Sequence, residues 1–240
     1  MRKILSHVRK AVDDYKMIEE GDRIAVGVSG GKDSMVLMLA LKELQRFYPK
    51  HFELEAICLD LGFKGADYTP LVELCREKEI NLNLVKTQIG EIVFDVRKEK
   101  NPCSLCSKMR RGALHEKAKE LGCNKVALGH HYDDVLETFF LCLFNEGRIS
   151  CFSPVTYLDR TELFLIRPFI YMEEREIKRY VYDNSVPVIH NPCPADGKTN
   201  RQDMKDFVAQ LNRNKHGVKE QIFHAIANSE IDGWRKKDES

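Results

Sequence analysis

The stretch SGGKDS at residues 29–34 combines residue types that bind phosphate. Its two glycines let the backbone approach an anion without a Cβ in the way, and its lysine supplies a compact positive charge. The serine hydroxyls can donate hydrogen bonds to phosphate, and the aspartate suits a magnesium ion. An apolar run precedes the stretch and helix-forming residues follow it, which favours a loop between a strand and a helix N-terminus. The predicted nucleotide-binding residues of this loop are Ser29, Gly30, Gly31, Lys32, Asp33 and Ser34.

The spacing within this loop excludes two common phosphate motifs. A Walker A loop needs a glycine where Val26 stands and a hydroxyl residue where Asp33 follows Lys32. The glycine spacing of a dinucleotide-binding fingerprint is absent as well. The loop instead resembles the PP-loop of ATP-pyrophosphatases, and this resemblance implies that ATP is cleaved between its α and β phosphates.

Cysteines form a second group of residues that could do chemistry. Cys103 and Cys106 make a C-x-x-C pair, and Cys193 lies in a later loop that could fold back toward them. Three thiolates can hold a 4Fe–4S cluster with one iron open to a further ligand, or a zinc ion with a water. The residues alone leave both metals open. The remaining cysteines are expected to be small core side chains, namely Cys58, Cys75, Cys123, Cys142 and Cys151.

Longer stretches resemble the tRNA 2-thiocytidine synthetase family. They are NPCSLCSKMRRGAL at 101–114, ALGHHYDDVLET at 127–138, IRPFIYMEEREI at 166–177 and NPCPADGKTNRQ at 191–202. The resemblance implies an enzyme that uses ATP and a 4Fe–4S cluster to replace oxygen by sulfur on C2 of a tRNA cytidine. It also implies that a sulfur donor, such as a cysteine desulfurase or free sulfide, is a partner.

The resemblance assigns the cluster to Cys103, Cys106 and Cys193. In one respect the chain departs from the family, since many members carry a second C-x-x-C pair near the C-terminus. Here His190 and Asn191 precede Pro192 and Cys193, so only the later cysteine of that pair is matched. Ligation of a cluster by three cysteines is compatible with this departure.

The resemblance further implies roles for residues at strand ends and helix starts. Besides Lys32 and Asp33, the catalytic candidates are Arg110, Asp133 and Asp134. The further nucleotide-binding candidates are Leu59, Asp60, Gly129 and His130. Simpler interpretations remain for several of them. Arg110 could be a solvated surface charge, Asp60 a turn residue, and the paired aspartates ordinary stabilising carboxylates at a helix N-terminus.

The implied chemistry explains why ATP and a cluster would be combined. The O2 oxygen of a pyrimidine leaves poorly, but its attack on the α-phosphate expels pyrophosphate and gives an adenylated base. Sulfur can then attack C2 while AMP departs. Lys32 and magnesium would stabilise charge in the first half, and the open iron would deliver sulfur in the second.

Three other functions are compatible with part of this pattern. A PP-loop enzyme that makes 2-thiouridine would share the cluster and differ in its base pocket. An amine ligase similar to lysidine synthetase would leave the three cysteines unexplained. A non-catalytic sensor with iron–sulfur or zinc that binds nucleic acid would not need the intact loop at residues 29–34.

Strands and helices alternate along the first part of the chain, as in a parallel sheet covered by helices on both faces. Strands are expected at residues 23–28, 52–61, 82–89 and 124–130. Helices are expected at residues 2–19, 34–44, 68–80, 109–122 and 133–147. In such folds ligands bind at the carboxyl ends of the strands, which is where both groups of candidate residues lie.

The pattern changes near residue 150. We expect a nucleotide-binding domain at residues 1–150 and a C-terminal extension at 151–240 that packs on it and carries the third cluster cysteine. Within the extension, a hairpin or two short strands are expected at residues 156–169. Helices are expected at residues 173–184, 201–213 and 217–229.

Charge and composition indicate the surroundings of the protein. The net charge is only +1, but residues 97–111 and 198–219 each hold six lysines and arginines. These basic stretches suit an RNA, and Lys198 and Arg201 could hold its phosphates or lie in water. No apolar run is long enough to cross a membrane, and Asp13, Asp14 and Glu19 stand where a signal peptide would need an apolar core, so we expect a cytoplasmic protein. In that compartment the eight cysteines are not expected to form structural disulfides. A homodimer is compatible with the resemblance, although no self-complementary surface is visible in the sequence.

Overall fold

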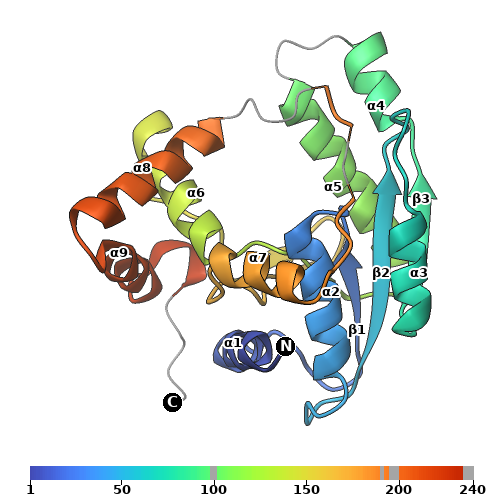
Figure 1. The fold of residues 1–240 in the computed structure, drawn as a ribbon, viewed down its shortest axis with the longest axis horizontal. Coiled ribbons are helices and arrows are strands. Elements are labelled where there is room, and N and C mark those ends of the chain that lie inside the picture. Colours follow the sequence, from blue (N-terminus) through green and yellow to red (C-terminus); the bar gives the residue numbers. More distant parts are fainter. Residues whose placement is uncertain (98–101, 190–191, 195–199, 235–240) are drawn as a thin grey trace.

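The computed structural model of the protein describes residues 1–97, 102–189, 192–194 and 200–234. At its centre the described residues form a six-stranded sheet with the order β3-β2-β1-β4-β6-β5 (Figure 1). The strands are β1 (Asp22–Gly27), β2 (Phe52–Asp60), β3 (Asn81–Lys86), β4 (Lys125–Ala127), β5 (Val155–Leu158) and β6 (Leu163–Ile166). Neighbouring strands are parallel except for β5, which runs antiparallel to β6. The expected parallel sheet is therefore confirmed.

Helices cover both faces of the sheet, as expected. They are α1 (Arg2–Asp14), α2 (Lys32–Leu44), α3 (Thr69–Glu77), α4 (Ile89–Glu91), η1 (Ile92–Val96), α5 (Pro102–Glu120), α6 (Tyr132–Asn145), α7 (Glu174–Asp183), α8 (Asn200–Asn214), α9 (Val218–Ala227) and η2 (Ile231–Gly233). Figure 1 shows α7 beside α2, and α8 and α9 beside α6.

Alternating residues of the buried strands belong to two separate hydrophobic cores. Ile24 and Val26 of β1 point into the larger core, which packs against α1, α2, α6 and α7. Ala25, between them, joins a smaller core with Ala118 of α5 on the opposite face. This alternation is the period of a strand, and each fully buried Ile or Val contributes roughly 1.5–3 kcal/mol of hydrophobic free energy. The two cores hold α2 and α5 on opposite faces, so their N-terminal ends flank the same edge of the sheet.

Three expected elements differ in the structure. The first helix ends at Asp14 instead of residue 19, because Lys16 adopts a left-handed φ of 48° and Met17 N–H closes the helix by donating to Val12 O. The third strand ends at Lys86, and the chain then forms α4 and the π-helical turn η1. The C-x-x-C pair lies inside α5, which begins at Pro102, and not in a loop before a helix.

The segment from residue 151 onward contributes to the same sheet. The hairpin β5–β6 joins it through parallel pairing of β6 with β4. Helices α8 and α9 then pack on α6. Every helix of the described residues is too short or too polar to span a lipid bilayer.

Candidate nucleotide and thiol site

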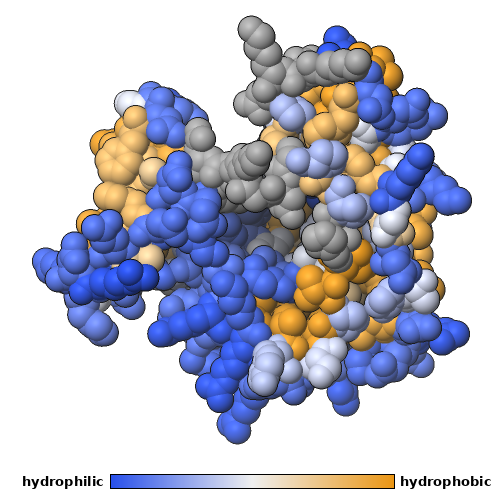
Figure 2. Space-filling view, turned by 45° about the horizontal axis from the view of Figure 1, so that its top comes forward, coloured by the Kyte–Doolittle hydropathy of each residue, from blue (hydrophilic) through white to orange (hydrophobic). Residues whose placement is uncertain are grey.

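A cavity of about 490 Å³ opens at the carboxyl ends of β1, β2 and β4, where the fold predicts a ligand. Its walls are formed by the glycine-rich loop, the ends of the strands and one face of α5. Among the expected site residues, those that line it are Ser29, Gly31, Asp33, Ser34, Leu59, Arg110, Gly129, His130 and Asp134. Figure 2 shows that the surface is hollowed between the two upper lobes of the molecule. These residues come from four stretches of the chain, whereas Gly30, Lys32, Asp60 and Asp133 do not line the cavity.

The glycine-rich loop is held in shape by its own serines. Ser29 N–H donates to the Ser34 hydroxyl oxygen at 3.1 Å, and that hydroxyl donates to Gly31 O at 2.9 Å. Helix α2 begins directly afterwards, with Gly31 as its N-cap and no side chain capping it. The N–H groups at this helix start therefore remain available to an anion, and the helix dipole favours negative charge there.

Two glycines are required by close contacts in this region. Gly30 has a φ of 83°, and a Cβ on it would lie 2.6 Å from the Cβ of Ile189. Ile189 N–H donates to Gly30 O at 2.9 Å, so the segment that leads to Cys193 is attached to the loop. A Cβ on Gly129 would lie 3.1 Å from the backbone of Asp33 and Ser34. Glycine is thus needed where three chain segments meet.

Lys32 lies between two carboxylates. Its ammonium group is 2.9 Å from Asp33 Oδ2 and 3.0 Å from Glu174 Oε1, at the start of α7. Burial lowers the pKa of Lys32, but these ion pairs outweigh burial and hold that pKa above its usual value. Lys32 is therefore a fixed positive charge at the loop.

The other oxygen of Asp33 is suited to a cation. Asp33 Oδ1 is buried and has no hydrogen-bond partner among the described residues. The Nε2 atom of His131 lies 3.8 Å from it, beyond hydrogen-bonding range. A buried carboxylate oxygen without a partner is costly, and a magnesium ion would satisfy it.

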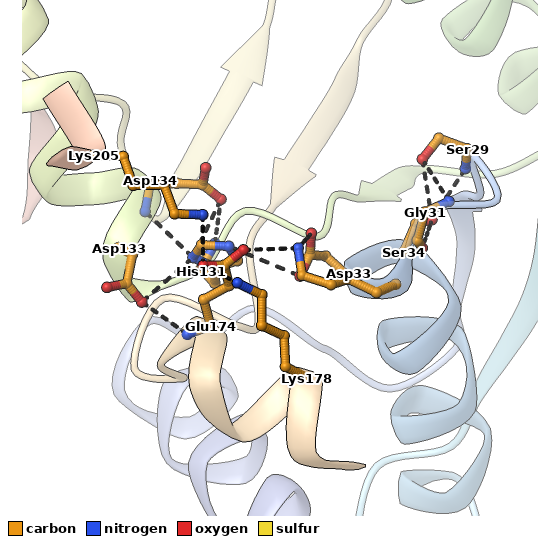
Figure 3. A network of polar contacts seen from close by, with 11 residues as sticks. Ser29, Gly31, Asp33, Ser34, His131, Asp133, Asp134, Glu174, Lys178 and Lys205 are labelled. Carbon is orange, nitrogen blue, oxygen red and sulfur yellow. Dashed lines mark hydrogen bonds and ion pairs between the residues drawn. The ribbon is translucent and has the colours of Figure 1, made fainter. Parts of the chain in front are cut away.

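The consecutive residues Asp133 and Asp134 face different surroundings (Figure 3). Asp134 accepts from His131 N–H at 2.9 Å and closes a capping box at the start of α6, while it lines the cavity. Asp133 accepts from Glu174 N–H at 2.8 Å and pairs with Lys219 of α9. Burial raises the pKa of Asp133, but these contacts outweigh burial and lower that pKa. Asp133 therefore connects three helices.

The end of β2 forms the apolar wall of the cavity. Leu59 lines it, together with Tyr68, which the sequence did not single out. Asp60 instead accepts from Gly62 N–H at 2.9 Å and from Tyr68 Oη at 3.5 Å. Burial, helped by Asp60, raises the pKa of Tyr68 to about 12, so its hydroxyl is a neutral donor. The side chain of Asp60 thus stabilises the turn that follows β2.

The three candidate cysteines lie beyond Arg110 of the cavity wall. Cys103 and Cys106 are three residues apart on α5, one exposed and one buried, and Cys193 is half-buried. Burial raises the pKa of Cys106, Arg110 lowers it, and Cys193 and Cys103 raise it further. Arg110 and both other thiols are therefore close enough to act on Cys106 electrostatically.

The three thiols are the candidate ligands of a metal centre. Among the described residues, no three histidine, cysteine or carboxylate side chains are grouped tightly enough to hold one metal ion. A 4Fe–4S cluster binds each thiolate through a different iron, so its ligands need not converge on one point. Cys106 also packs with Leu61 and Val93, the apolar surroundings in which such clusters are shielded from water. The thiols of Cys103, Cys106 and Cys193 supply the three donors that a cluster with one open iron would need.

Several expected residues fall outside this description. His190, Asn191, Lys198 and the side chain of Arg201 lie outside the described residues. The five other cysteines are buried, as expected.

The sequence analysis missed three residues of the site, Glu174, Lys205 and Lys219, although Glu174 lies within the stretch IRPFIYMEEREI. Their contacts cross from one helix to another, and no local pattern marks such pairs.

Comparisons with known proteins agree with this site. A family model described as a PP-loop domain matches residues 2–211. A tRNA-cytidine(32) 2-sulfurtransferase from Geobacter metallireducens is 39% identical over 230 residues, which cover 95% of this chain and 90% of the relative. A protein of the same name from Geobacter sulfurreducens is 38% identical, with the same coverage of both chains.

Solved structures give the same fold. The U34-tRNA thiolase NcsA from Methanococcus maripaludis, with its 4Fe-4S cluster, matches with a TM-score of 0.75 and 25% identity, covering 93% of this chain and 76% of that one. The NH3-dependent NAD synthetase from Campylobacter jejuni matches with a TM-score of 0.51 and 14% identity, covering 93% of this chain and 91% of that one, which shows the fold alone. The chain therefore belongs to the PP-loop family, among relatives named tRNA-cytidine(32) 2-sulfurtransferase.

Proposed function

We propose that the protein is an ATP-dependent tRNA sulfurtransferase that converts a tRNA cytidine, at position 32 as in the named relatives, to 2-thiocytidine. One observation carries the proposal. Arg110 forms part of the wall of the phosphate-loop cavity and lies one helical turn after Cys106 on α5. An adenylated base in the cavity would thus lie beside the group that supplies sulfur.

The glycine-rich loop would bind the phosphates of ATP. The N–H groups at the start of α2, the hydroxyl of Ser29 and the ammonium of Lys32 supply donors and positive charge for them. Asp33 Oδ1 would bind Mg²⁺, which satisfies its buried oxygen. Leu59, Gly129 and the neighbouring apolar wall would hold adenine.

Cys103, Cys106 and Cys193 would hold a 4Fe–4S cluster. Such a cluster would supply an open iron at which sulfide can bind and be presented as a nucleophile. Arg110 would stabilise both the negative charge of the thiolates and that of the α-phosphate. Asp134, at the cavity, would contact the base or the magnesium ion, and Asp133 would position α7 and α9 around it.

The reaction balances with ATP, sulfide and cytidine as reactants. The O2 oxygen of the base forms a bond to the α-phosphorus while the bond to the bridging oxygen breaks and pyrophosphate leaves. Hydrosulfide then attacks C2, loses its proton, and the C2–O bond breaks as AMP leaves with the original oxygen. Lys32 and Mg²⁺ would stabilise the first step, because negative charge accumulates on pyrophosphate there.

A uridine is the second candidate substrate. The solved structure with the higher TM-score is a U34-tRNA thiolase with a 4Fe-4S cluster, which favours uridine as the alternative base. The same reaction at O2 of uridine would give 2-thiouridine.

The proposal includes a sulfur donor and a compartment. Free sulfide or a cysteine desulfurase would supply the sulfur, and the eight free cysteines suit the reducing cytoplasm. A homodimer is also compatible with the proposal.

The test is thiolation of tRNA by the anaerobically reconstituted protein with ATP, Mg²⁺ and sulfide. We expect nucleoside mass spectrometry to detect 2-thiocytidine, with one AMP and one pyrophosphate released for each sulfur inserted. Cys106→Ser should reduce thiolation by at least about ten-fold, because it removes a metal ligand. Cys123→Ser, at a buried cysteine of the small core just after α5, should retain it.

The outcomes separate the candidate functions. Formation of 2-thiouridine would replace the cytidine assignment and keep the chemistry. If wild-type protein that binds ATP releases no AMP in the presence of tRNA, the enzyme proposal is wrong and a non-catalytic sensor is favoured. A loss of activity in Cys123→Ser equal to that in Cys106→Ser would remove the argument for the three-cysteine site.

A further inference from the structure

The carboxylate of Glu174 forms ion pairs with three lysines from three helices, beside the glycine-rich loop. Figure 3 labels two of them, Lys178 and Lys205. Its Oε1 pairs with Lys32 of α2 at 3.0 Å. Its Oε2 pairs with Lys205 of α8 at 2.7 Å and with Lys178 of α7 at 3.1 Å. Burial raises the pKa of Glu174, but the three ammonium groups outweigh burial and hold that pKa far below its usual value. The carboxylate is therefore fully ionised at neutral pH.

The position of Glu174 is fixed from two sides. It is the first residue of α7, where the helix dipole favours a carboxylate, and its N–H donates to Asp133. Because its carboxylate bridges Lys32 and Lys205, the two ammonium groups lie within reach of one diphosphate group. Among the described residues the ion pairs of these three lysines are with two carboxylates, those of Glu174 and Asp33, which leaves this part of the group with excess positive charge.

The three lysines are not equivalent. Lys32 belongs to the phosphate loop, and its side chain is 26% exposed. Lys205 reaches the same carboxylate from a different part of the chain and is 39% exposed. Lys178 pairs with Glu174 along its own helix, four residues on, and is 56% exposed. Lys178 therefore has the character of an ordinary surface helix pair, whereas Lys205 extends across from α8 toward the loop.

We infer that Lys205 is a second pyrophosphate-binding residue and that Glu174 positions it beside Lys32. This inference rests on the proposed nucleotide site and adds a residue that the glycine-rich loop does not contain. The β and γ phosphates of ATP carry more negative charge than one carboxylate, so they compete with Glu174 for both ammonium groups. Lys205 then stabilises the leaving pyrophosphate together with Lys32.

The inference also gives α8 a part in the reaction. Helix α8 begins at Asn200, in the same C-terminal part of the chain as Cys193, so through Lys205 this part would contribute a phosphate-binding group as well as a thiol.

The test is equilibrium binding of ATP, pyrophosphate and AMP, each with Mg²⁺, to the full-length protein by calorimetry. Lys205→Met should weaken binding of ATP and pyrophosphate by about ten-fold, the effect of losing one charged hydrogen bond. Its affinity for AMP, which lacks the β and γ phosphates, should change less than about two-fold. Lys205→Arg, which retains the charge, should restore most of the affinity.

Lys178→Met is the matched control, because it removes an ammonium group from the same oxygen of Glu174. We expect its affinities for all three ligands to stay within about two-fold of wild type. Equal losses in Lys178→Met and Lys205→Met would overturn the inference, since both lysines would then act only through Glu174. Loss of AMP binding in Lys205→Met equal to the loss of ATP binding would also overturn it.

Binding is measured without tRNA or sulfide, so the outcome is independent of thiolation. If wild-type protein binds ATP no more tightly than AMP, the phosphate-loop assignment fails together with this inference. If the binding pattern is as expected but no thionucleoside forms, only the proposed function fails.

Discussion

Asp133 and Asp134 show how adjacent identical residues can acquire separate roles. The backbone at the start of α6 turns Asp134 toward the cavity and Asp133 toward α7 and α9. Asp133 is mostly buried and satisfied by an N–H group and an ammonium group, so its charge stabilises the folded protein. Asp133 acts on the site through Glu174, because its carboxylate accepts a hydrogen bond from the Glu174 N–H.

Asp133→Asn should therefore lower the free energy of unfolding in a pH-dependent way. The folded-state pKa of Asp133 lies below the pKa of the same carboxyl in the unfolded chain, so the unfolded chain takes up the proton more readily as the pH falls. The stabilisation is fully present above that value and is lost as the pH falls through the lower folded-state pKa. We expect a loss of about 1–3 kcal/mol at pH 7 and a smaller difference from wild type at pH 3, measured by urea unfolding.

Asp183→Asn provides the comparison for this variant. Asp183 makes an i,i+4 pair with Arg179 and its side chain is 52% exposed, so its loss should cost less than about 0.5 kcal/mol at either pH. A difference between Asp133→Asn and wild type that stays constant from pH 7 to pH 3 would show that the charge of Asp133 does not stabilise the fold.

Among the elements, the glycine-rich loop depends on a contact that its own sequence does not contain. Gly30→Ala should lower the free energy of unfolding for two reasons. Alanine is strained at a φ of 83°, and its Cβ would lie 2.6 Å from the Cβ of Ile189. The strain costs about 1–2 kcal/mol, and the overpacking adds about 1–3 kcal/mol. Chemical unfolding and ATP binding measure both effects, and we expect weaker ATP binding because the loop must shift.

Gly65→Ala separates the two contributions. Gly65 has a φ of 86° but no atom lies within 4 Å of the position of its Cβ, so only the backbone strain should appear. If both alanine variants lose the same stability, the contact between the loop and Ile189 contributes nothing. ATP binding by Gly65→Ala should equal that of wild type.

Elements were more predictable from the sequence than their ends. The strand at the glycine-rich loop and the helix after it were expected because apolar periodicity and glycine punctuation are local signals. The start of α5 was missed, since polar residues around Cys103 and Cys106 resemble a loop until the helix is packed on the sheet. The end of α1 was also missed, because Lys16 gives no sign of its left-handed φ.

The same division holds for the site. Ser29, Lys32 and Asp33 were predicted because one short segment carries them all. Lys205 and Glu174 could not be predicted, because their pairing depends on how α7 and α8 pack, and 31 positions separate them along the chain. Arg110 was expected at the start of a helix near the cysteines; it lies inside α5, one helical turn beyond Cys106, and lines the cavity.

The whole molecule is organised around one sheet edge at which both parts of the chain meet. The C-terminal segment adds β5 and β6 to the sheet and contributes Lys205 and Lys219 to carboxylates at the site. The boundary expected near residue 150 therefore marks a change in sequence pattern within one continuous sheet. A substrate held at this edge contacts elements from both parts.

This arrangement predicts where tRNA phosphates bind. Lys108 and Arg111 are exposed one helical turn apart on α5, and Arg111 lines the cavity. The double variant Lys108→Gln, Arg111→Gln should weaken tRNA binding and lower the salt slope, log Kd against log salt concentration, by about 1 for each lost phosphate contact. Affinity for ATP should be unchanged, because the glycine-rich loop and Lys32 are intact.

Lys117→Gln, Lys119→Gln is the matched control, since it removes the same charge from the other end of α5. Those two lysines pair with Glu120 and Glu162 away from the cavity, so tRNA affinity and its salt slope should stay close to wild type. Fluorescence anisotropy with labelled tRNA over a series of salt concentrations gives both quantities. If the two double variants lower the slope equally, the RNA responds to net charge alone and does not lie across the mouth of the cavity. If only the first does, the base enters past the N-terminal half of α5, on the side where Cys106 and Arg110 lie.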